Sequence, residues 1–138
     1  MHAIGLTGGF ATGKTFVLKV LEEQGCFTLR ADDLAKSILF APGSPVLQEI
    51  AGLFGADILD AGGALDKEKF SQALFEDHEK RQAVNAIVHP LVGEERRRKI
   101  AEAAQVGIYD FLFYESALLL ESGIHRDFER VVVAYCSA

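Results

Sequence analysis

The stretch that decides the fold reads Gly8-Gly9-Phe10-Ala11-Thr12-Gly13-Lys14-Thr15. It matches the pattern Gly-x-x-x-x-Gly-Lys-[Ser/Thr], in which glycines let the backbone wrap closely around a polyphosphate. Residues 3–7 before it are short and apolar and predict a buried strand, whereas residues 14–24 after it have the spacing of an amphipathic helix. A loop between a strand and a helix is the context in which this motif binds phosphate. A glycine-rich turn with a capping threonine is the alternative interpretation.

The chemistry of such a loop gives its residues their roles. Successive backbone N–H groups of all eight residues, Gly8 to Thr15, face the phosphates, and the following helix points its positive end at them. Lys14 is expected to reach the β- and γ-phosphates and to act in catalysis, and the Thr15 hydroxyl is expected to bind Mg²⁺. The loop therefore predicts ATP and Mg²⁺ as cofactors.

The remaining strands predict an α/β protein with an insertion. Residues 26–29 form a second short strand, which completes a strand–helix–strand unit with a parallel strand pair. Further strands are predicted at 108–114 and 130–135. Nearly eighty residues separate the second and third strands, too many for a simple crossover. We expect a P-loop three-layer core with a parallel sheet, residues 1–35 and 106–138, and an inserted helical lobe, residues 36–105.

Capping residues and helix breakers divide the insertion into helices. A first helix runs to about residue 40, and Asp32 or Asp33 can cap it. Pro90 is expected to end one helix and to start another that runs to about residue 105. Further caps are expected at Ser44, which Pro45 follows, and at Asp66 and Asp77. A turn is expected at residues 60–63, and Gly55 is expected to end a helix.

Two carboxylates follow predicted strands of the core. Ligands of open α/β sheets bind beyond the carboxyl ends of the strands, so Asp32 can orient an acceptor hydroxyl and take its proton. A helix N-cap is the competing interpretation of Asp32. Glu115 follows the apolar strand 111–114, where a carboxylate holds Mg²⁺ or its water in P-loop enzymes. An ordinary charge at a strand end is the competing interpretation of Glu115.

Composition and charge exclude several classes of function. The chain has 138 residues, 49% hydrophobic and 25% charged, which is typical of a globular domain. Its net charge of −6 argues against broad attraction to nucleic acid or to an anionic membrane. The N-terminus has no signal-peptide pattern, and no apolar run is long enough to span a membrane. A cytoplasmic protein is therefore expected.

The basic run 96–99 looks like a binding patch, but a structural account competes with it. Glu94–Arg98 and Glu95–Lys99 have the spacing of ion pairs within one helix, which favours a solvated helix face. One or two of these arginines could still face a substrate phosphate. His89 precedes Pro90, so either a hydrogen bond at a helix end or a ligand contact explains it.

Several motifs, taken together, resemble the dephospho-CoA kinase family in order along the whole chain. They are Ile4-Gly5-Leu6-Thr7-Gly8-Gly9, Ala31-Asp32 with Leu34-Ala35-Lys36, Pro42-Gly43-Ser44-Pro45, Leu65-Asp66, His89-Pro90-Leu91 and Leu118-Leu119-x-Glu121-Ser122.

The resemblance implies an activity, phosphorylation of the ribose 3′-hydroxyl of dephospho-CoA by ATP, which is the last step of coenzyme A synthesis. It also implies that the helical insertion holds the CoA substrate. Asp32 aligns with the proposed catalytic base of that family. Together with Asp32, the substrate-binding residues that the resemblance implies are Lys36, His89, Leu118 and Glu121.

The sequence departs from the family pattern at two places and in its extent. Arg30 stands where the family has the first aspartate of Asp-Ala-Asp, and Glu115-Ser116-Ala117 stands for Asp-x-Pro. Family members continue with a lid that carries arginines, so residues 1–138 are expected to transfer phosphate slowly. The alternatives are another small-molecule or nucleotide kinase, and a catalytically impaired nucleotide-binding fragment. The expected partner is dephospho-CoA, with no nucleic acid and no membrane, and the expected state is a monomer or weak homo-oligomer.

Overall fold

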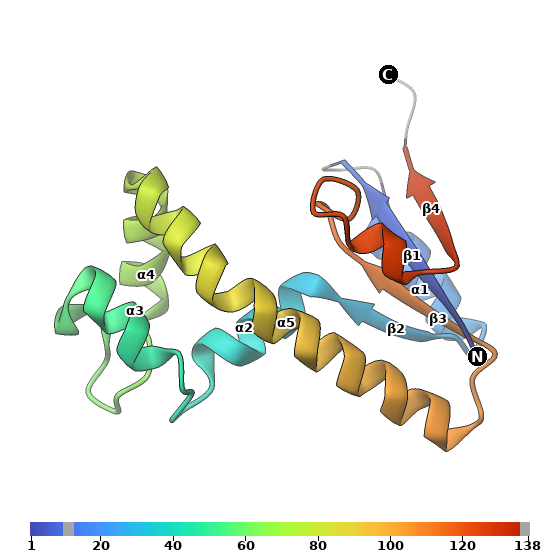
Figure 1. The fold of residues 1–138 in the computed structure, drawn as a ribbon, viewed down its shortest axis with the longest axis horizontal. Coiled ribbons are helices and arrows are strands. Elements are labelled where there is room, and N and C mark those ends of the chain that lie inside the picture. Colours follow the sequence, from blue (N-terminus) through green and yellow to red (C-terminus); the bar gives the residue numbers. More distant parts are fainter. Residues whose placement is uncertain (10–12, 136–138) are drawn as a thin grey trace. The chain divides into compact units, whose positions relative to one another are not determined.

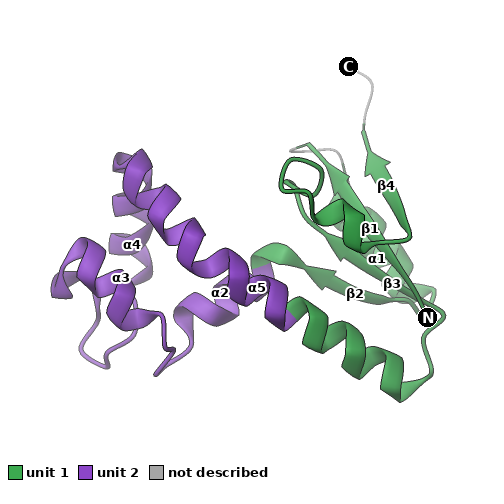
Figure 2. Cartoon of the chain, viewed as in Figure 1, with its two compact units in different colours: residues 1–32, 96–138 green, residues 33–95 purple. Residues whose placement is uncertain are grey.

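The computed structural model describes residues 1–9 and 13–135, and it divides the chain into two compact units. The first unit comprises Met1–Asp32 and Arg96–Ala138, and the second comprises Asp33–Glu95 (Figure 2). The second unit begins at residue 33 and ends at residue 95, whereas the sequence led us to expect a helical insertion over 36–105.

A parallel four-stranded sheet forms the first unit, as predicted (Figure 1). Its strand order is β2-β3-β1-β4, and each neighbouring pair is parallel. The expected pairing of β1 with β2 is wrong, because β3 lies between these two strands. The strands and the helix that connects the first two are β1 (His2–Gly8), α1 (Lys14–Glu23), β2 (Phe27–Arg30), β3 (Phe111–Glu115) and β4 (Arg130–Ala134).

The sheet is held together by apolar residues of its two central strands. Leu6 of β1 and Leu112 of β3 are fully buried, and Tyr114 of β3 is 1% exposed. The strand β3 begins three residues later than expected, since Ile108 lies outside it and is 71% exposed. The spacing of residues 14–24 predicts Val17, Val20, Leu21 and Gln24 on the inner face of α1. In this helix the buried residue is Leu18, Val17 and Leu21 are half-buried, and Val20 is 37% exposed, so the predicted face is only partly correct.

Close packing inside this unit leads to a prediction about Gly5 of β1. A Cβ atom on Gly5 would lie 2.6 Å from the Cδ2 atom of Leu119, a residue with 0% exposure. We expect Gly5→Ala to lower the free energy of unfolding by about 1–3 kcal/mol because of overpacking. Gly52, in helix α3 (Leu47–Phe54), is the control, since a Cβ there meets nothing within 4 Å. Gly52→Ala is expected to stabilise by about 0.5–1 kcal/mol. Urea unfolding followed by circular dichroism measures both, and an unchanged midpoint for Gly5→Ala would contradict the packing account.

The second unit is helical, and an aromatic cluster forms its core. Phe70 is 2% exposed, and its ring meets the rings of Phe40 and Phe54 edge-on, at centroid distances of 6.1 Å and 5.8 Å. Such edge-to-face contacts add to the free energy gained by burying the rings. The helices that contribute residues to this unit are α2 (Ala31–Phe40), α3, α4 (Lys67–Glu76) and α5 (His78–Val106).

The predicted helix caps at Asp66 and Asp77 are confirmed, and the one at Ser44 is wrong. The Asp66 carboxylate accepts a hydrogen bond from the backbone N–H of Lys69, and the Asp77 carboxylate accepts one from Lys80. Ser44 does not cap α3, since that helix begins three residues later and the Ser44 hydroxyl donates to the carbonyl of Ile38. The predicted glycine stop is confirmed, because Gly55 follows α3 with φ of 96° and donates to the carbonyl of Ala51.

The predicted helix break at Pro90 is wrong. The helix α5 runs for 29 residues without interruption, and Pro90 lies inside it. Proline lacks an N–H group, so one hydrogen bond of the helix is lost, at a cost of about 3 kcal/mol. Burial on both sides of the proline offsets this cost, since Val88 is 4% exposed and Val92 is 7% exposed. None of the helices that the structure describes is long and apolar enough to cross a membrane.

Candidate functional site

The glycine loop lies at the carboxyl end of β1, as the motif predicts. Gly8 ends β1, and Gly13 takes the N-cap position of α1 with φ of 85°, a left-handed conformation that favours glycine. Lys14 and Thr15 are the first two residues of α1. Gly9 follows the strand, whereas Phe10, Ala11 and Thr12 lie outside the described residues. The N-terminus of α1 therefore directs its backbone N–H groups and its positive dipole toward this loop.

An ion pair joins the loop to the neighbouring strand. The Nζ atom of Lys14 lies 3.0 Å from the Oε1 atom of Glu115, and the two side chains are 15% and 14% exposed. Partial burial strengthens this attraction relative to an ion pair in water. The pairing of β1 with β3 produces the contact, since Leu6 of β1 is in register with Glu115. The two residues singled out from separate parts of the sequence thus meet at one edge of the sheet.

The donors at this edge fit a magnesium ion. The Glu115 carboxylate and the Thr15 hydroxyl offer hard oxygen atoms, which Mg²⁺ prefers. Among the described residues, no group of three or more histidine, cysteine, aspartate or glutamate side chains could hold a metal ion alone. Mg²⁺ commonly binds through one or two protein oxygens together with substrate phosphates, so the small donor set fits it.

Asp32 lies in the first turn of α2, directly after β2. The helix begins at Ala31, so neither Asp32 nor Asp33 precedes it, and the expectation that one of them is an N-cap was wrong. Both aspartates are exposed. The last residue of β2, Arg30, is in register with Glu115 of β3. Asp32 therefore comes two residues after the end of β2, and that strand end is paired with the one that carries Glu115. Asp32 belongs to the same unit as Lys14 and Glu115.

The segment after β3 carries two further predicted residues, Leu118 and Glu121, and both are exposed. Leu119 anchors this segment, because its side chain is fully buried. The backbone N–H of Ser116 donates to the carbonyl of Leu6, at 3.0 Å, and fixes where the segment leaves the sheet. Leu118 and Glu121 are thus free to contact a ligand, whereas Leu119 is structural.

The second unit contains the other two predicted residues. Lys36 lines a cavity of about 660 Å³, and the other lining residues are Ser37, Phe40, Ala41, Lys67 and Ser71. The Nζ atom of Lys67 lies 5.2 Å from the centre of the Phe40 ring. His89 is exposed and lies in the interior of α5, so the expected hydrogen bond at a helix end is wrong.

The burial of one cation, Arg96, was not predicted from the sequence. Arg96, in the part of α5 that belongs to the first unit, is 3% exposed, whereas we expected this basic run to form a solvated face. Its Nη2 atom donates to the Oδ2 atom of Asp127 at 2.9 Å. Asp127 ends the short helix η2 (Ile124–Asp127), which lies between β3 and β4. The buried residues Val88, Val92 and Arg96 recur every four positions, so the helical period across Pro90 was the signal.

Tyr114 links this arginine to the strand that carries Glu115. The guanidinium carbon of Arg96 lies 5.3 Å from the centre of the Tyr114 ring, and Phe128 stacks on that ring with centroids 5.5 Å apart. Burial raises the pKa of Tyr114 above its ordinary value. The positive charge of Arg96 opposes this rise, whereas the charges of Glu115 and Asp32 add to it. The phenol therefore stays protonated at neutral pH.

Comparison with known proteins identifies the family. The sequence pattern described as "Dephospho-CoA kinase" matches residues 2–138. A dephospho-CoA kinase of Syntrophotalea carbinolica is 38% identical over 133 residues, which cover 96% of this chain and 62% of the relative. One of Corynebacterium glutamicum is 39% identical over 137 residues, which cover 96% of this chain and 66% of the relative. The chain thus spans less than two thirds of the length of these relatives.

Solved structures agree on the fold. The chain resembles TT1252 from Thermus thermophilus with a TM-score of 0.72 and 28% identity, over 97% of this chain and 65% of the other. The dephospho-CoA kinase from Campylobacter jejuni superimposes with a TM-score of 0.73 and 19% identity, over 95% and 64% of the two chains. The latter likeness concerns the fold, whereas the family assignment rests on the sequence match over residues 2–138. The chain belongs to the dephospho-CoA kinase family.

Proposed function

We propose that this protein transfers the γ-phosphoryl group of ATP to the ribose 3′-hydroxyl of dephospho-CoA. The observation that carries the proposal is the pair of Lys14 and Glu115, 3.0 Å apart, at the glycine loop between β1 and α1. Membership of the dephospho-CoA kinase family supports the choice of acceptor. A phosphoryl transfer site needs a cation for the phosphates and a carboxylate for the metal, and this edge of the sheet provides both.

Each residue of the nucleotide site has a proposed task. The backbone of the glycine loop, including Gly8, Gly9 and Gly13, wraps the phosphates, and Lys14 neutralises the β- and γ-phosphates. Thr15 and Glu115 would hold Mg²⁺, which would offset the negative charge of the phosphates when bound. Lys14 must turn from Glu115 toward the phosphates, because the same ammonium group serves both partners.

Asp32 is proposed as the base that takes the proton of the acceptor hydroxyl. Its position after β2 places it at the edge of the sheet where ligands of parallel α/β proteins bind. A positioned carboxylate can orient the hydroxyl and accept its proton as the oxygen bonds to the γ-phosphorus and the bond from that phosphorus to ADP breaks.

The second unit is proposed to hold the part of dephospho-CoA that does not react. Its cavity of about 660 Å³ has two lysines, two serines and the face of Phe40 among its lining residues. Lysines and hydroxyls suit phosphate oxygens, and the apolar floor suits a carbon chain, so a phosphorylated molecule with an apolar arm fits it. Contacts of His89, Leu118 and Glu121 with the substrate also stay predictions, as do a cytoplasmic location and a monomeric or weakly oligomeric state.

A panel of acceptors tests the proposed reaction. Dephospho-CoA, AMP, adenosine and a pyrimidine nucleoside monophosphate are each incubated with the protein and Mg–ATP, and ADP and the phosphorylated product are measured by mass spectrometry. We expect phosphorylation of dephospho-CoA to exceed that of the other acceptors. Preference for a nucleoside monophosphate, or release of ADP without any phosphorylated acceptor, would contradict the proposal.

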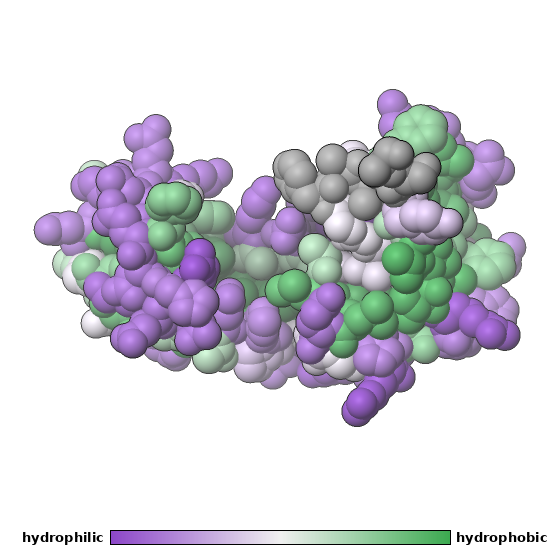
Figure 3. Space-filling view, turned by 90° about the horizontal axis from the view of Figure 1, so that it is seen from above, coloured by the Kyte–Doolittle hydropathy of each residue, from purple (hydrophilic) through white to green (hydrophobic). Residues whose placement is uncertain are grey.

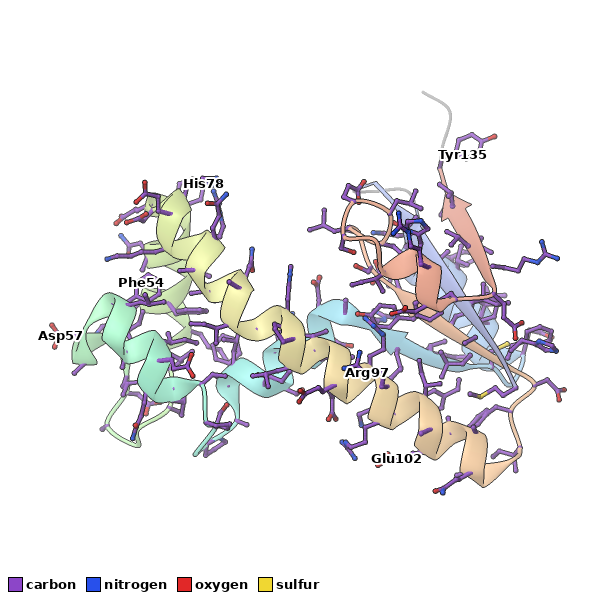
Figure 4. All side chains as sticks on the ribbon, in the orientation of Figure 1. Phe54, Asp57, His78, Arg97, Glu102 and Tyr135 are labelled. Atoms are coloured by element: carbon purple, nitrogen blue, oxygen red, sulfur yellow. The ribbon has the colours of Figure 1, made fainter. Side chains whose placement is uncertain are left out.

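The role of Glu115 gives a prediction that depends on the metal. We expect Glu115→Gln to weaken binding of Mg–ATP by about tenfold, because the variant loses a charged metal ligand. Binding of ATP in EDTA should be equal or tighter, since Lys14 is no longer held by a competing carboxylate. Calorimetric titration with and without Mg²⁺ measures both. Glu102→Gln is the matched control, since Glu102 pairs with Arg98 on the surface of α5 (Figure 4). Equal losses with and without Mg²⁺ would rule out a metal-binding role for Glu115.

A further inference from the structure

The buried guanidinium of Arg96 lacks a full set of partners. Its Nη2 atom donates to Asp127, and the group lies over the ring of Tyr114. Its Nη1 atom is shielded from solvent and has no hydrogen-bond partner among the residues that the structure describes. Buried donors without a partner are rare in folded proteins, so this atom requires an explanation.

Stability does not explain the presence of an arginine here. The Asp127 side chain is 58% exposed, and ion pairs with a solvated partner contribute little to folding. A buried donor without a partner opposes folding. The same stripe of α5 holds Val88, Val92 and Ala103, all buried, so an apolar side chain at position 96 would continue it. Apolar replacements of buried ion pairs are often neutral or stabilising.

The position of Arg96 in the first unit suggests a role in binding. Tyr114 directly precedes Glu115, the partner of Lys14, on strand β3. Tyr114 is also in register with Leu29 of β2, the strand that leads to Asp32. The guanidinium lies over the Tyr114 ring, one residue before the carboxyl end of β3, and the charges of Glu115 and Asp32 both act on that ring's phenol. It is therefore near the end of the sheet where the proposed acceptor must place its hydroxyl. Lys14 is proposed to serve the phosphates of ATP, so Arg96 is the buried cation, among the described residues of this unit, that could serve a phosphate of the acceptor at these strand ends.

We propose that Arg96 binds a phosphate oxygen of the phosphorylated acceptor through its Nη1 group, an inference that rests on the proposed function. Guanidinium groups suit phosphate oxygens because they present several donors in one plane. Asp127 holds the group before the acceptor binds. Since Asp127 is largely exposed, water can solvate its carboxylate when the guanidinium turns toward the ligand.

Calorimetry with two acceptor ligands tests the inference. The full chain is saturated with Mg²⁺ and a non-hydrolysable ATP analogue, and is then titrated with dephospho-CoA or with adenosine, which lacks phosphate. We expect Arg96→Met to weaken dephospho-CoA binding by about tenfold or more. Adenosine binding should not change, and the melting temperature should be equal or higher. Arg96→Lys should restore part of the affinity, because it keeps the charge.

Arg97→Met is the matched control, since Arg97 is the exposed neighbour on the same helix (Figure 4). It should leave both affinities unchanged. Two results would overturn the inference while the proposed function stands. One is wild-type affinity of Arg96→Met for dephospho-CoA, and the other is an equal loss of affinity for dephospho-CoA and adenosine. Failure of the wild type to bind dephospho-CoA would instead contradict the proposed function.

A second variant serves if Arg96→Met does not fold. Asp127→Asn keeps the guanidinium and removes its competing charge, so dephospho-CoA should bind equally or more tightly. A loss of affinity in Asp127→Asn that is as large for adenosine as for dephospho-CoA would show that the pair of Arg96 and Asp127 is structural, and would overturn the inference.

Discussion

Lys14→Ala is expected to weaken ATP binding by about 10- to 100-fold. The lysine is half of a partly buried ion pair at the glycine loop, with its Nζ atom 3.0 Å from Glu115. Hydrogen bonds to charged groups contribute about 1.5–3 kcal/mol, which corresponds to this range of affinities. The loss has a second source, because Glu115 is left without its cation and repels the phosphates. Calorimetric titration with ATP measures the change.

Two further variants separate these contributions. Lys19→Ala, on the exposed side of α1, removes the same charge from the same helix and should leave ATP affinity unchanged. The double variant of Lys14→Ala and Glu115→Gln, titrated without Mg²⁺, should recover part of the affinity that Lys14→Ala loses, because the unpaired carboxylate is gone. Wild-type affinity in Lys14→Ala would show that ATP binds elsewhere.

Asp32→Asn is expected to slow phosphoryl transfer by about 100- to 10,000-fold, the range that positioned acid–base groups contribute. The amide keeps the size of the carboxylate but cannot accept the proton of the acceptor hydroxyl. Binding of ATP and dephospho-CoA should change little, so the effect belongs to the chemical step. Transfer is measured in a single turnover with excess protein, so that the chemical step is followed apart from product release.

Asp33→Asn is the matched control for this assignment. Both aspartates are exposed and lie in the first turn of α2, so the two variants change the helix in the same way. Transfer at the wild-type rate in Asp33→Asn, with a large loss in Asp32→Asn, supports Asp32 as the base. The opposite result would move the role to Asp33.

Most strands and helices of the core, and the place of the glycine loop between β1 and α1, could be predicted from the sequence because local patterns determine them. The glycine loop, the first strand and the first helix are adjacent in the chain, so their arrangement follows from short-range signals. The place of Lys14 and Glu115 at one edge of the sheet follows from a rule of topology, since the carboxyl ends of parallel strands share that edge, but the ion pair between them was not predicted. The parallel direction of the strands was predicted, whereas the place of β3 between β1 and β2 was not.

The errors concern positions where burial outweighs local propensity. Pro90 was expected to break a helix, but the buried Val88 and Val92 on either side of it support a continuous α5. The assumed break restarted the helical period after residue 90, so Arg96 was assigned to the solvated face. Counting across the proline would have placed it on the buried stripe.

Other features depend on tertiary packing that no local pattern contains. The cavity around Lys36 arises from side chains of α2 and α4, which are distant in sequence. Figure 3 shows hydrophobic residues, coloured green, at the surface of the molecule. The exposed hydrophobic residues of the first unit include Val132 and Val133 of β4. These residues were part of an apolar run that predicted a strand correctly, but a strand pattern does not state which strand lies at the edge of the sheet.

The position of the transferred phosphate tests the proposed reaction most directly. The protein is mixed in stoichiometric amount with Mg–ATP and dephospho-CoA, and the mixture is followed by phosphorus NMR over a long incubation. We predict that ADP forms together with a new phosphomonoester resonance at the ribose 3′ position, and that both appear far more slowly with Asp32→Asn. Unchanged dephospho-CoA in the presence of folded protein, or phosphate at another position, would contradict the account.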